Sequence, residues 1–454
     1  MKYVTQAMSD LGSYVNICIS RLNEKIYMLK RYIFDRSANF KRLTAVLAVL
    51  IIGVTGTLLL LKGHASVPSV TLSADQGTLS GPAAVQSCAG ASDGNCVVFG
   101  SSTGGTARCP LTTSFSATYQ PSCWLPFLST SPLNTPLPAS PKLATYSSTV
   151  INHLLTYNWQ FPGGSSAFSL PGSSGSRPSY FANPADPLIK ISSCSGRCLD
   201  QNGVSIVGSS FHIPKNAVPG GNTDSHLDVI ETDTGNEYDF WQASVNYTTG
   251  TMTATNGDLD NVLTGTGVQL KVGADAAGFS LLGGLLRPSE LLDNTNSSTP
   301  INHALVLDVG CVANGSTSGI PSSVYPSITR GSDGCIDSSK GDGPPYGSLF
   351  KLNMSDSEIA ASGAPSWEQT IMKTISHYGA YVSDTQSVDS MYIFAQTCDS
   401  WTTLGVPDLF QKVDQQIGTG YYSNGGCNYG LKSSIPIPVN KLEVVDPCVP
   451  KKTC

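Results

Sequence analysis

The chain has 454 residues, enough for one large domain or two to three smaller ones, and only 13% of them are charged. Glycine, serine, threonine and proline are abundant, which is typical of a secreted, loop-rich β protein and argues against a cytosolic α/β enzyme. Residues 63–454 carry 17 basic and 29 acidic side chains, an acidic balance that excludes the basic surface on which nucleic-acid binding depends.

The first part of the chain predicts a membrane anchor. Residues 1–42 hold eight lysines and arginines against three acids, and Leu43–Leu61 is an uncharged run of 19 residues. A helix of that length spans a bilayer core, and the basic flank favours a cytoplasmic N-terminus. We therefore predict a single-pass cell-membrane protein with residues 1–42 inside and the rest outside. A cleavable signal peptide ending at Gly63-His64-Ala65 is the alternative.

Twelve of the 13 cysteines follow this segment, and they fall in close successive pairs. In an oxidising compartment this spacing predicts up to six local disulfides. A zinc site is the competing interpretation, but there is no C-x-x-C pair and no histidine at ligand spacing beside the cysteines. The predicted pairs are Cys88–Cys96, Cys109–Cys123, Cys194–Cys198, Cys311–Cys335, Cys398–Cys427 and Cys448–Cys454.

Residues 62–179 are rich in Ser, Thr, Gly and Pro and read as a stalk or a small disulfide-stapled module. From residue 180 to 454 the pattern changes to short apolar or alternating runs separated by turn residues. This texture predicts a mainly β domain, a β-sandwich of jelly-roll type with one or two short helices. The expected strands are Leu188–Ile191, Ser205–Val207, Phe211–Ile213, His226–Glu231, Glu237–Gln242, Thr251–Thr255, Gly267–Val272, His303–Val309, Ser348–Leu352, Ala380–Ser383 and Met391–Ala395.

Two helices are expected within this domain. The first covers Pro288–Leu292, where proline suits the first turn. The second covers Trp367–Tyr378, with a capping box formed by Ser366 and Gln369 and a stop at Gly379.

Residues 223–243 predict a β-hairpin around which the chain's candidate chemistry gathers. Both arms alternate between apolar and polar residues, and the segment 232–236 between them has turn chemistry. If the loop has an even residue count, the polar residues of both arms share one face. With an odd count they lie on opposite faces, because a shift of one residue turns every side chain over.

Several short motifs occur in a fixed order between residues 205 and 390. This order resembles that of a largely uncharacterised family of secreted bacterial proteins. The resemblance implies an extracellular domain and carries no established activity. The motifs begin at Asp224 (D-x-H-L-x-V), Glu237 (E-Y-x-F-W), Gly283 (G-G-L-x-R-P-x-E, here G-G-L-L-R-P-x-E), His303 (H-A-L) and Tyr378 (Y-G-A-Y-V-x-D).

The candidate site consists of carboxylates, imidazoles and an aromatic platform. Paired carboxylates across a hairpin lie within the separation that glycoside hydrolysis requires, and tryptophan can stack on a sugar ring. The alternative is that this acidic face is simply the solvated side of a sandwich. The predicted catalytic residues are His226, Asp228, Glu237, Asp239 and His303, and the predicted substrate-binding residues are Trp241, Arg287 and Tyr381.

Two places in the sequence offer possible metal ligands. Asp224, His226, Asp228 and Glu237 offer ligands that suit Ca²⁺ or a transition metal, and residues 256–261 resemble part of a calcium-binding turn. A plain acidic turn is the simpler interpretation of residues 256–261. No metal or other cofactor is therefore expected. If a metal does bind, Ca²⁺ is the ion that these residues would accommodate.

Two functions remain open from the sequence. One is a membrane-anchored extracellular enzyme, a glycoside hydrolase or polysaccharide lyase, that cleaves a surface polysaccharide. The other is a non-catalytic surface protein that binds a cell-envelope glycan or organises the envelope. In both, the partners are a glycan and the membrane, and nucleic acid is excluded.

Overall fold

The computed structural model describes most of the chain from residue 108 onward. The described parts are residues 108–118, 120–156, 177–221, 223–268, 273–292, 299–315, 319–328, 343–385, 391–418 and 438–454, with strands β1 (Ala83–Ser87), β2 (Asn95–Phe99), β3 (Ser166–Ser169), β17 (Tyr421–Ser423), β18 (Tyr429–Leu431) and β19 (Ile435–Ile437). Contacts divide the chain into Met1–Ser101 and Ser102–Cys454. In the first unit, β1 and β2 form an antiparallel pair.

No helix in the described parts is long and apolar enough to cross a membrane. The predicted anchor Leu43–Leu61 lies outside those parts.

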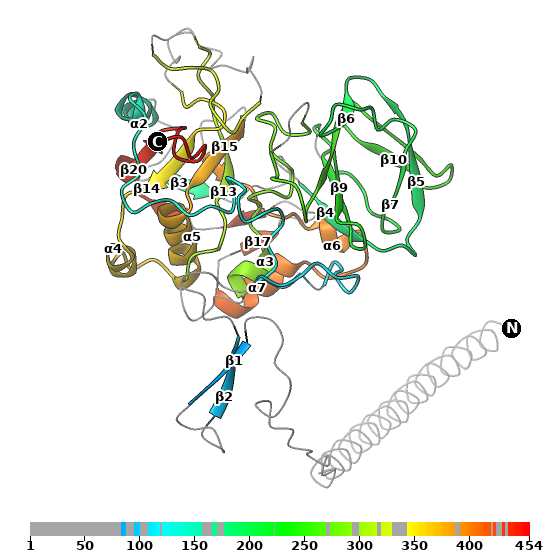
Figure 1. Ribbon diagram of the computed structural model, residues 1–454, viewed down its shortest axis with the longest axis horizontal. Helices are drawn as coiled ribbons and strands as arrows, with labels where there is room; N and C mark the ends of the chain where they lie inside the picture. Colours follow the sequence, from blue (N-terminus) through cyan, green and yellow to red (C-terminus); the bar gives the residue numbers. More distant parts are fainter. Residues whose placement is uncertain are drawn as a thin grey trace, which may run out of the picture. The chain divides into compact units, whose positions relative to one another are not determined.

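The second unit is mainly β with short helices, as predicted, and its largest sheet has seven strands in the order β19-β3-β16-β13-β15-β14-β20 (Figure 1). The remaining members of this sheet are β16 (Met391–Ile393), β13 (Leu305–Val309), β15 (Ala380–Thr385), β14 (Leu349–Leu352) and β20 (Leu442–Val445). The central strands β13 and β15 run parallel, and every residue of β13 is buried. Fully buried strands of this kind read as continuous apolar runs in the sequence, which is why they were found there.

Helices α4 (Asp356–Ala361) and α5 (Ser366–His377) connect β14 to β15, and α5 packs on the sheet through Trp367, Ile371 and Ile375. The predicted helices 288–292 and 367–378 are confirmed as α3 (Pro288–Leu292) and α5. Further helices are α2 (Ser147–Thr156), α6 (Asp399–Thr402), α7 (Leu409–Ile417) and the 3₁₀ turn η4 (Val439–Lys441).

The predicted capping box at Ser366 is wrong. Ser366 is already the first residue of α5, and the N-cap position is Pro365, which has no side chain to accept a hydrogen bond. A capping box does form one helix earlier, between Ser355 and Glu358 at the start of α4. The predicted stop is present: Gly379 has φ of +84°, the left-handed conformation that glycine adopts readily after a helix.

Two smaller sheets form a lobe beside the large sheet, at the right of Figure 1. One has five strands, β4 (Ser179–Ala182), β8 (Leu227–Glu231), β9 (Asn236–Trp241), β12 (Asn256–Asn261) and β6 (Cys198–Asp200), in that order. The other has the order β10 (Ser244–Asn246), β11 (Thr251–Ala254), β5 (Leu188–Cys194) and β7 (Ser210–His212). Their apolar side chains share one core, in which Phe211 stacks on Tyr238 at 4.5 Å between ring centroids.

The opposite face of the five-stranded sheet is also covered. Phe181 of β4 and Ile230 of β8 belong to the core of the large sheet. Phe181 meets Phe115 and Trp124 at centroid distances of 5.9 and 5.5 Å. Residues 108–156, which we expected in a stalk or small module, therefore contribute side chains to the same core as the main sheet.

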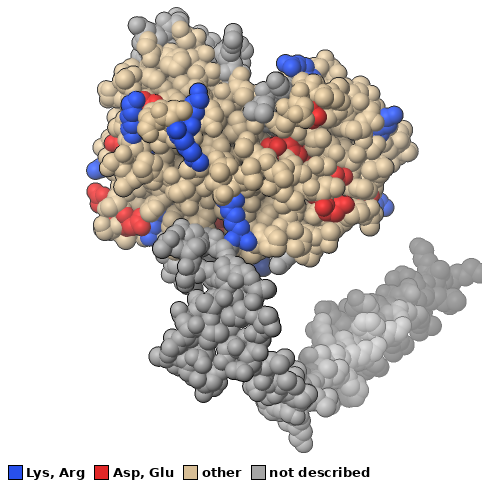
Figure 2. All heavy atoms as spheres, viewed as in Figure 1, with Lys and Arg blue, Asp and Glu red and all other residues tan. Residues whose placement is uncertain are grey.

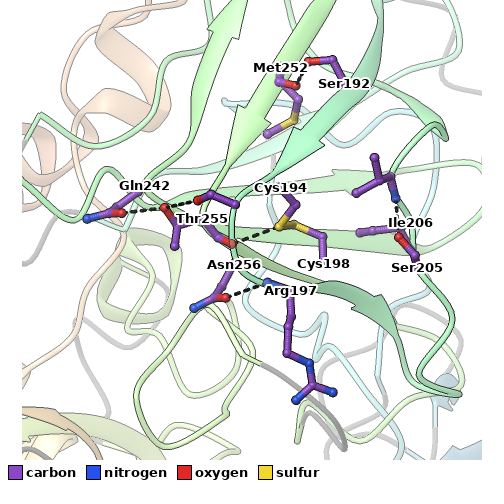
Figure 3. Close-up of a disulfide and its surroundings, with 12 residues drawn as sticks. Ser192, Cys194, Arg197, Cys198, Ser205, Ile206, Gln242, Met252, Thr255 and Asn256 are labelled. Atoms are coloured by element: carbon purple, nitrogen blue, oxygen red, sulfur yellow. Dashed lines mark hydrogen bonds between the residues drawn. A yellow bond between two sulfur atoms is a disulfide. The ribbon is translucent and has the colours of Figure 1, made fainter.

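Three of the predicted disulfides are confirmed: Cys109–Cys123, Cys194–Cys198 and Cys448–Cys454. Cys311 and Cys398 are also disulfide-bonded, and their predicted partners lie outside the described parts. Figure 3 shows Cys194–Cys198, which links β5 of one lobe sheet to β6 of the other, beside the hydrogen bond from the Arg197 amide to Asn256 Oδ1.

Nine of the eleven predicted strands coincide with observed strands. Residues 205–207 form only an isolated bridge at Ser205, and part of 267–272 lies outside the described parts. The predicted acidic turn at 256–261 is strand β12, so the calcium-binding turn proposed there does not form.

Candidate functional site

The hairpin takes the even register. Asp228 of β8 pairs with Asp239 of β9, and Ile230 pairs with Glu237, so Asp228, Glu237 and Asp239 lie on one face of the hairpin. Gly235 closes the turn with φ of +74° and donates its amide hydrogen to the Glu231 carbonyl. The predicted acidic face therefore exists as one surface.

This face is not solvated. Asp228, Glu237 and Asp239 are at most 1% exposed, because the segment around Ser280 covers them. Ser280 Oγ donates a short hydrogen bond to Glu237 Oε1, and the Leu281 amide donates to Asp239 Oδ2 at 3.0 Å. The solvated-face interpretation is excluded, and none of the three carboxylates reaches a surface where a polysaccharide would bind.

Burial changes the acidity of these groups. It raises the pKa of Asp228 to about 7, and together with neighbouring carboxylates it raises the pKa of Glu237 and Asp239 well above the usual range. Strand β12 adds Asp258 and Asp260 beside them, opposite Asp239 and Glu237.

His226 and Trp241 lie on the same face as the three carboxylates, at the end of the hairpin away from the turn. They follow directly after the pair Leu227–Phe240. There they line a pocket of about 360 Å³. The other lining residues are Asp224, Asn256, Gly273, Ala274, Asp275, Ala276, Asp384 and Thr385. The pocket thus lies between the hairpin, β15 and the segment 273–276.

In this pocket the orientation of Trp241 and the charge of His226 are both set by their surroundings. The Trp241 indole Nε1 donates to Asp224 Oδ1 at 3.2 Å, which orients the ring. His226 is only 5% exposed, and burial together with the nearby Arg177 lowers the pKa of its imidazole to about 3. The ring is therefore neutral at physiological pH.

A buried arginine organises the far side of the pocket. Arg177 Nη2 lies 2.5 Å from Asp275 Oδ2 and 3.4 Å from Asp384 Oδ2, and its guanidinium stacks on Phe394 at 3.6 Å. The Asp384 side chain keeps 25% of its surface exposed, whereas Asp275 has none. Asp384 is thus the carboxyl group of this pair that faces the pocket.

The carboxyl groups around Arg177 are proton-retaining. Burial and the neighbouring Asp275 raise the pKa of Asp384 to about 7, although Arg177 opposes the shift. Burial and Asp384 raise the pKa of Asp308, its partner across β13 and β15, well above the usual range. One guanidinium cannot compensate three buried carboxylates, because their mutual repulsion makes full ionisation unfavourable. At least one of the three therefore holds a proton near neutral pH.

Sequence reasoning missed Arg177, Asp275 and Asp308. Asp308 was detectable, because an acid in the middle of the buried run L-V-L-D-V is unusual and signals a special environment. Arg177 and Asp275 lie in segments without periodicity and carry no such signal. The sequence indicates Asp224 as a possible metal ligand and Asp384 only as a member of a motif.

Two predicted residues, His303 and Arg287, lie at another place. Both contact Glu290: Arg287 Nη2 and His303 Nε2 lie 2.6 and 2.9 Å from Glu290 Oε1. Although burial opposes it, these two groups lower the pKa of Glu290 to about 2. His303 Nδ1 lies 2.8 Å from the Ala304 carbonyl oxygen, so both ring nitrogens already face acceptors. All three side chains are buried.

Tyr381 is also separate from the hairpin. Its ring is buried against Phe279, its hydroxyl donates to the Pro132 carbonyl, and it lines a different pocket of about 500 Å³ near the C-terminus. Of the predicted residues, the structure brings His226 and Trp241 together in one pocket and places Asp228, Glu237 and Asp239 beneath the same face. His303, Arg287 and Tyr381 are not part of it.

Comparison of the chain with protein-family models, curated proteins and solved structures found no match. The geometry of the site therefore carries the functional argument by itself.

Proposed function

We propose that the protein binds a polysaccharide in the pocket between His226, Trp241 and Asp384 and cleaves it by acid–base catalysis. The observation that carries this proposal is a protonatable carboxyl group, Asp384, facing a pocket that also holds an oriented indole. Carbohydrate sites combine these two features, because the sugar ring stacks on the aromatic face while its glycosidic oxygen needs a proton.

Asp384 is the proton donor in this proposal. A general acid works best when its pKa lies near the operating pH, and burial with Asp275 brings the pKa of Asp384 to about 7. Arg177 and Asp275 fix the position of Asp384 from behind. Asp224, the other pocket carboxylate at the surface of the hairpin, is the partner that acts as base or nucleophile.

His226 and Trp241 bind the substrate. The neutral His226 ring lines the pocket without adding charge, and Trp241 offers its ring face. Asp228, Glu237 and Asp239 are enclosed and cannot contact a substrate, so the catalytic roles fall to the pocket carboxyl groups Asp384 and Asp224. His303 and Arg287 receive a structural role with Glu290.

The test uses purified full-length protein and a panel of bacterial surface polysaccharides, with reducing-end release as the measure of cleavage. Asp384→Asn should reduce turnover about 100-fold or more while binding stays within a few-fold. Trp241→Ala should weaken binding about 10-fold. Asp356→Asn, which changes an exposed carboxyl on α4, is the matched control and should leave both unchanged. Undiminished cleavage by the Asp384→Asn protein contradicts the proposal.

A non-catalytic glycan-binding protein is the second candidate. It is favoured by the fact that the two carboxylates to which catalysis is assigned already have protein partners, Trp241 for Asp224 and Arg177 for Asp384. Such fixed groups suit recognition as well as catalysis. Binding that depends on Trp241, with no turnover by the unmodified protein on any polysaccharide of the panel, selects this candidate.

We further propose that the domain acts outside the cell, anchored through residues 43–61, and that the resemblance to secreted bacterial proteins reflects common descent. The disulfides support an oxidising compartment, and the core shared by the two lobe sheets supports a sandwich-like arrangement there. Protease treatment of intact cells tests the location: digestion of residues 108–454 is expected, and protection of this part contradicts it.

A further inference from the structure

Five carboxyl groups lie side by side on the buried face of three adjacent strands. Asp228 of β8 pairs with Asp239 of β9, which pairs on its other side with Asp258 of β12, and Glu237 of β9 pairs with Asp260 of β12. None of the five is more than 7% exposed. Such a concentration of acids inside a protein requires compensation, because an isolated buried charge is very costly.

Three of the five have the geometry of a cation site. Asp228, Glu237 and Asp239 each place a carboxylate oxygen within 4.8 Å of those of the other two. Calcium lies about 2.3–2.6 Å from its oxygen ligands, so ligands on opposite sides of one ion are about 5 Å apart. All three can therefore contact the same ion. A donor set made only of oxygen suits a hard cation and not zinc or copper.

The hydrogen bonding of these groups is incomplete. Both carboxylate oxygens of Asp228 and Oε2 of Glu237 are buried and have no hydrogen-bond partner. The side chains of Ser179 and Asp239 lie beside the Asp228 carboxyl group. Buried polar atoms are almost always satisfied, so atoms without partners aimed at a common point indicate a missing ligand.

Protein cations do not compensate this charge. Within the described parts of the chain, no lysine or arginine forms an ion pair with Asp228, Glu237, Asp258 or Asp260. Arg177, which acts on His226 of the same hairpin, pairs instead with Asp275 and Asp384.

We propose that Asp228, Glu237 and Asp239 bind one Ca²⁺ ion inside the protein, with Ser179 Oγ as a further ligand. Ser179 pairs with Asp228 across β4 and β8, and its buried hydroxyl also has no hydrogen-bond partner. Asp258 and Asp260 lie outside the three-ligand set and add negative charge around it. The ion joins β4, β8 and β9 beneath the segment at Ser280, whatever ligand occupies the pocket.

The site is enclosed, so ion binding is coupled to folding. The ligands are brought together only by the hairpin register and by the cover over Glu237 and Asp239. An ion that binds the folded chain alone stabilises it in proportion to the logarithm of its concentration.

The test measures Ca²⁺ on the full-length protein. After dialysis against a calcium buffer, elemental analysis should find about one Ca²⁺ per chain, and removal by a chelator should lower the thermal midpoint by about 5 °C. Glu237→Gln should lose the bound ion and the response to the chelator. Asp233→Asn, which makes the matching change at an exposed acid in the turn of the same hairpin, should keep both.

Two results overturn the proposal. One is a folded wild-type protein that holds no Ca²⁺ and has the same thermal midpoint with and without the ion, which means that shared protons neutralise the cluster. The other is Ca²⁺ binding that survives in Glu237→Gln but is lost in Asp224→Asn, which places the ion in the pocket. If Glu237→Gln does not fold, the stoichiometry and thermal shift of the wild-type protein, compared with Asp228→Asn, decide the question.

Discussion

At the scale of single residues, the same side-chain type has different roles in different surroundings. Glu290 is enclosed and contacts both Arg287 and His303, whereas Asp384 shares one guanidinium with Asp275 and keeps part of its surface in the pocket. One carboxyl group has a pKa near 2 and the other near 7. The number of nearby cations and anions, more than burial alone, sets the direction of each shift.

Glu290→Gln should destabilise the protein strongly. The substitution leaves Arg287 and His303 buried without their carboxylate, and breaking such a buried pair costs about 3 kcal/mol or more. Denaturant unfolding measures the loss. Asp356→Asn removes the partner of His377 in an exposed acid–histidine pair and should cost less than about 1 kcal/mol. Equal costs for the two variants contradict a structural role for Glu290.

Asp384 should make stability depend on pH. Its carboxyl holds a proton up to a pKa of about 7 in the folded state but ionises near its ordinary pKa of 3.8 when unfolded. Between these values the folded state binds more protons, so stability falls as pH rises from about 4 to 7, by at most about 1.4 kcal/mol per pH unit. The groups facing it are Arg177, Asp275, Asp224 and Asp308.

Unfolding free energies of the wild-type protein and Asp384→Asn, measured between pH 4 and 8, check this dependence. The variant should show a shallower decline over that window, and Asp233→Asn should follow the wild type. A steeper decline in Asp384→Asn argues against a raised pKa at this position.

At the scale of elements, the hairpin β8–β9 shows how register determines a site. An even turn puts Asp228 opposite Asp239, and strand β12 then extends the same face. Alternation correctly predicted which residues share a face. It did not predict what covers that face, because the covering segment lies about 40 residues away in the sequence.

The Cys194–Cys198 disulfide should stabilise the lobe, since it links its two sheets. Replacing both cysteines with alanine should lower the unfolding free energy by about 2 kcal/mol, the amount expected for so short a loop. Denaturant titration provides the measurement. The pair Cys448–Cys454 closes a loop of similar length near the C-terminus, outside the lobe, and is the matched comparison. Its removal should leave the amide exchange of β5 and β6 unchanged, whereas removal of Cys194–Cys198 should accelerate it.

At the scale of the whole molecule, the described part of the second unit has two hydrophobic cores that meet at one sheet. The five-stranded sheet contributes Leu227 and Phe240 to the lobe core and Phe181 and Ile230 to the core of the large sheet. On the face seen in Figure 2, lysines and arginines lie scattered among uncharged and acidic residues.

Because this sheet belongs to both cores, the lobe and the large sheet should unfold together. Amide exchange in increasing denaturant should show β9 and β13 losing protection at the same midpoint. Loss of protection in β9 well before β13 means that the lobe is an independent folding unit.

Much of this organisation followed from local patterns. Alternation, apolar runs and turn residues located nine strands, two helices and the hairpin, and cysteine spacing predicted the three disulfides described in full. These features depend on neighbouring residues, so the sequence by itself determined them. Tertiary structure decided the rest: which face of the hairpin is buried, that Arg177 meets Asp275 and Asp384, and that His303 pairs with Glu290. Those contacts join segments far apart in the chain, and no local pattern records how distant segments pack.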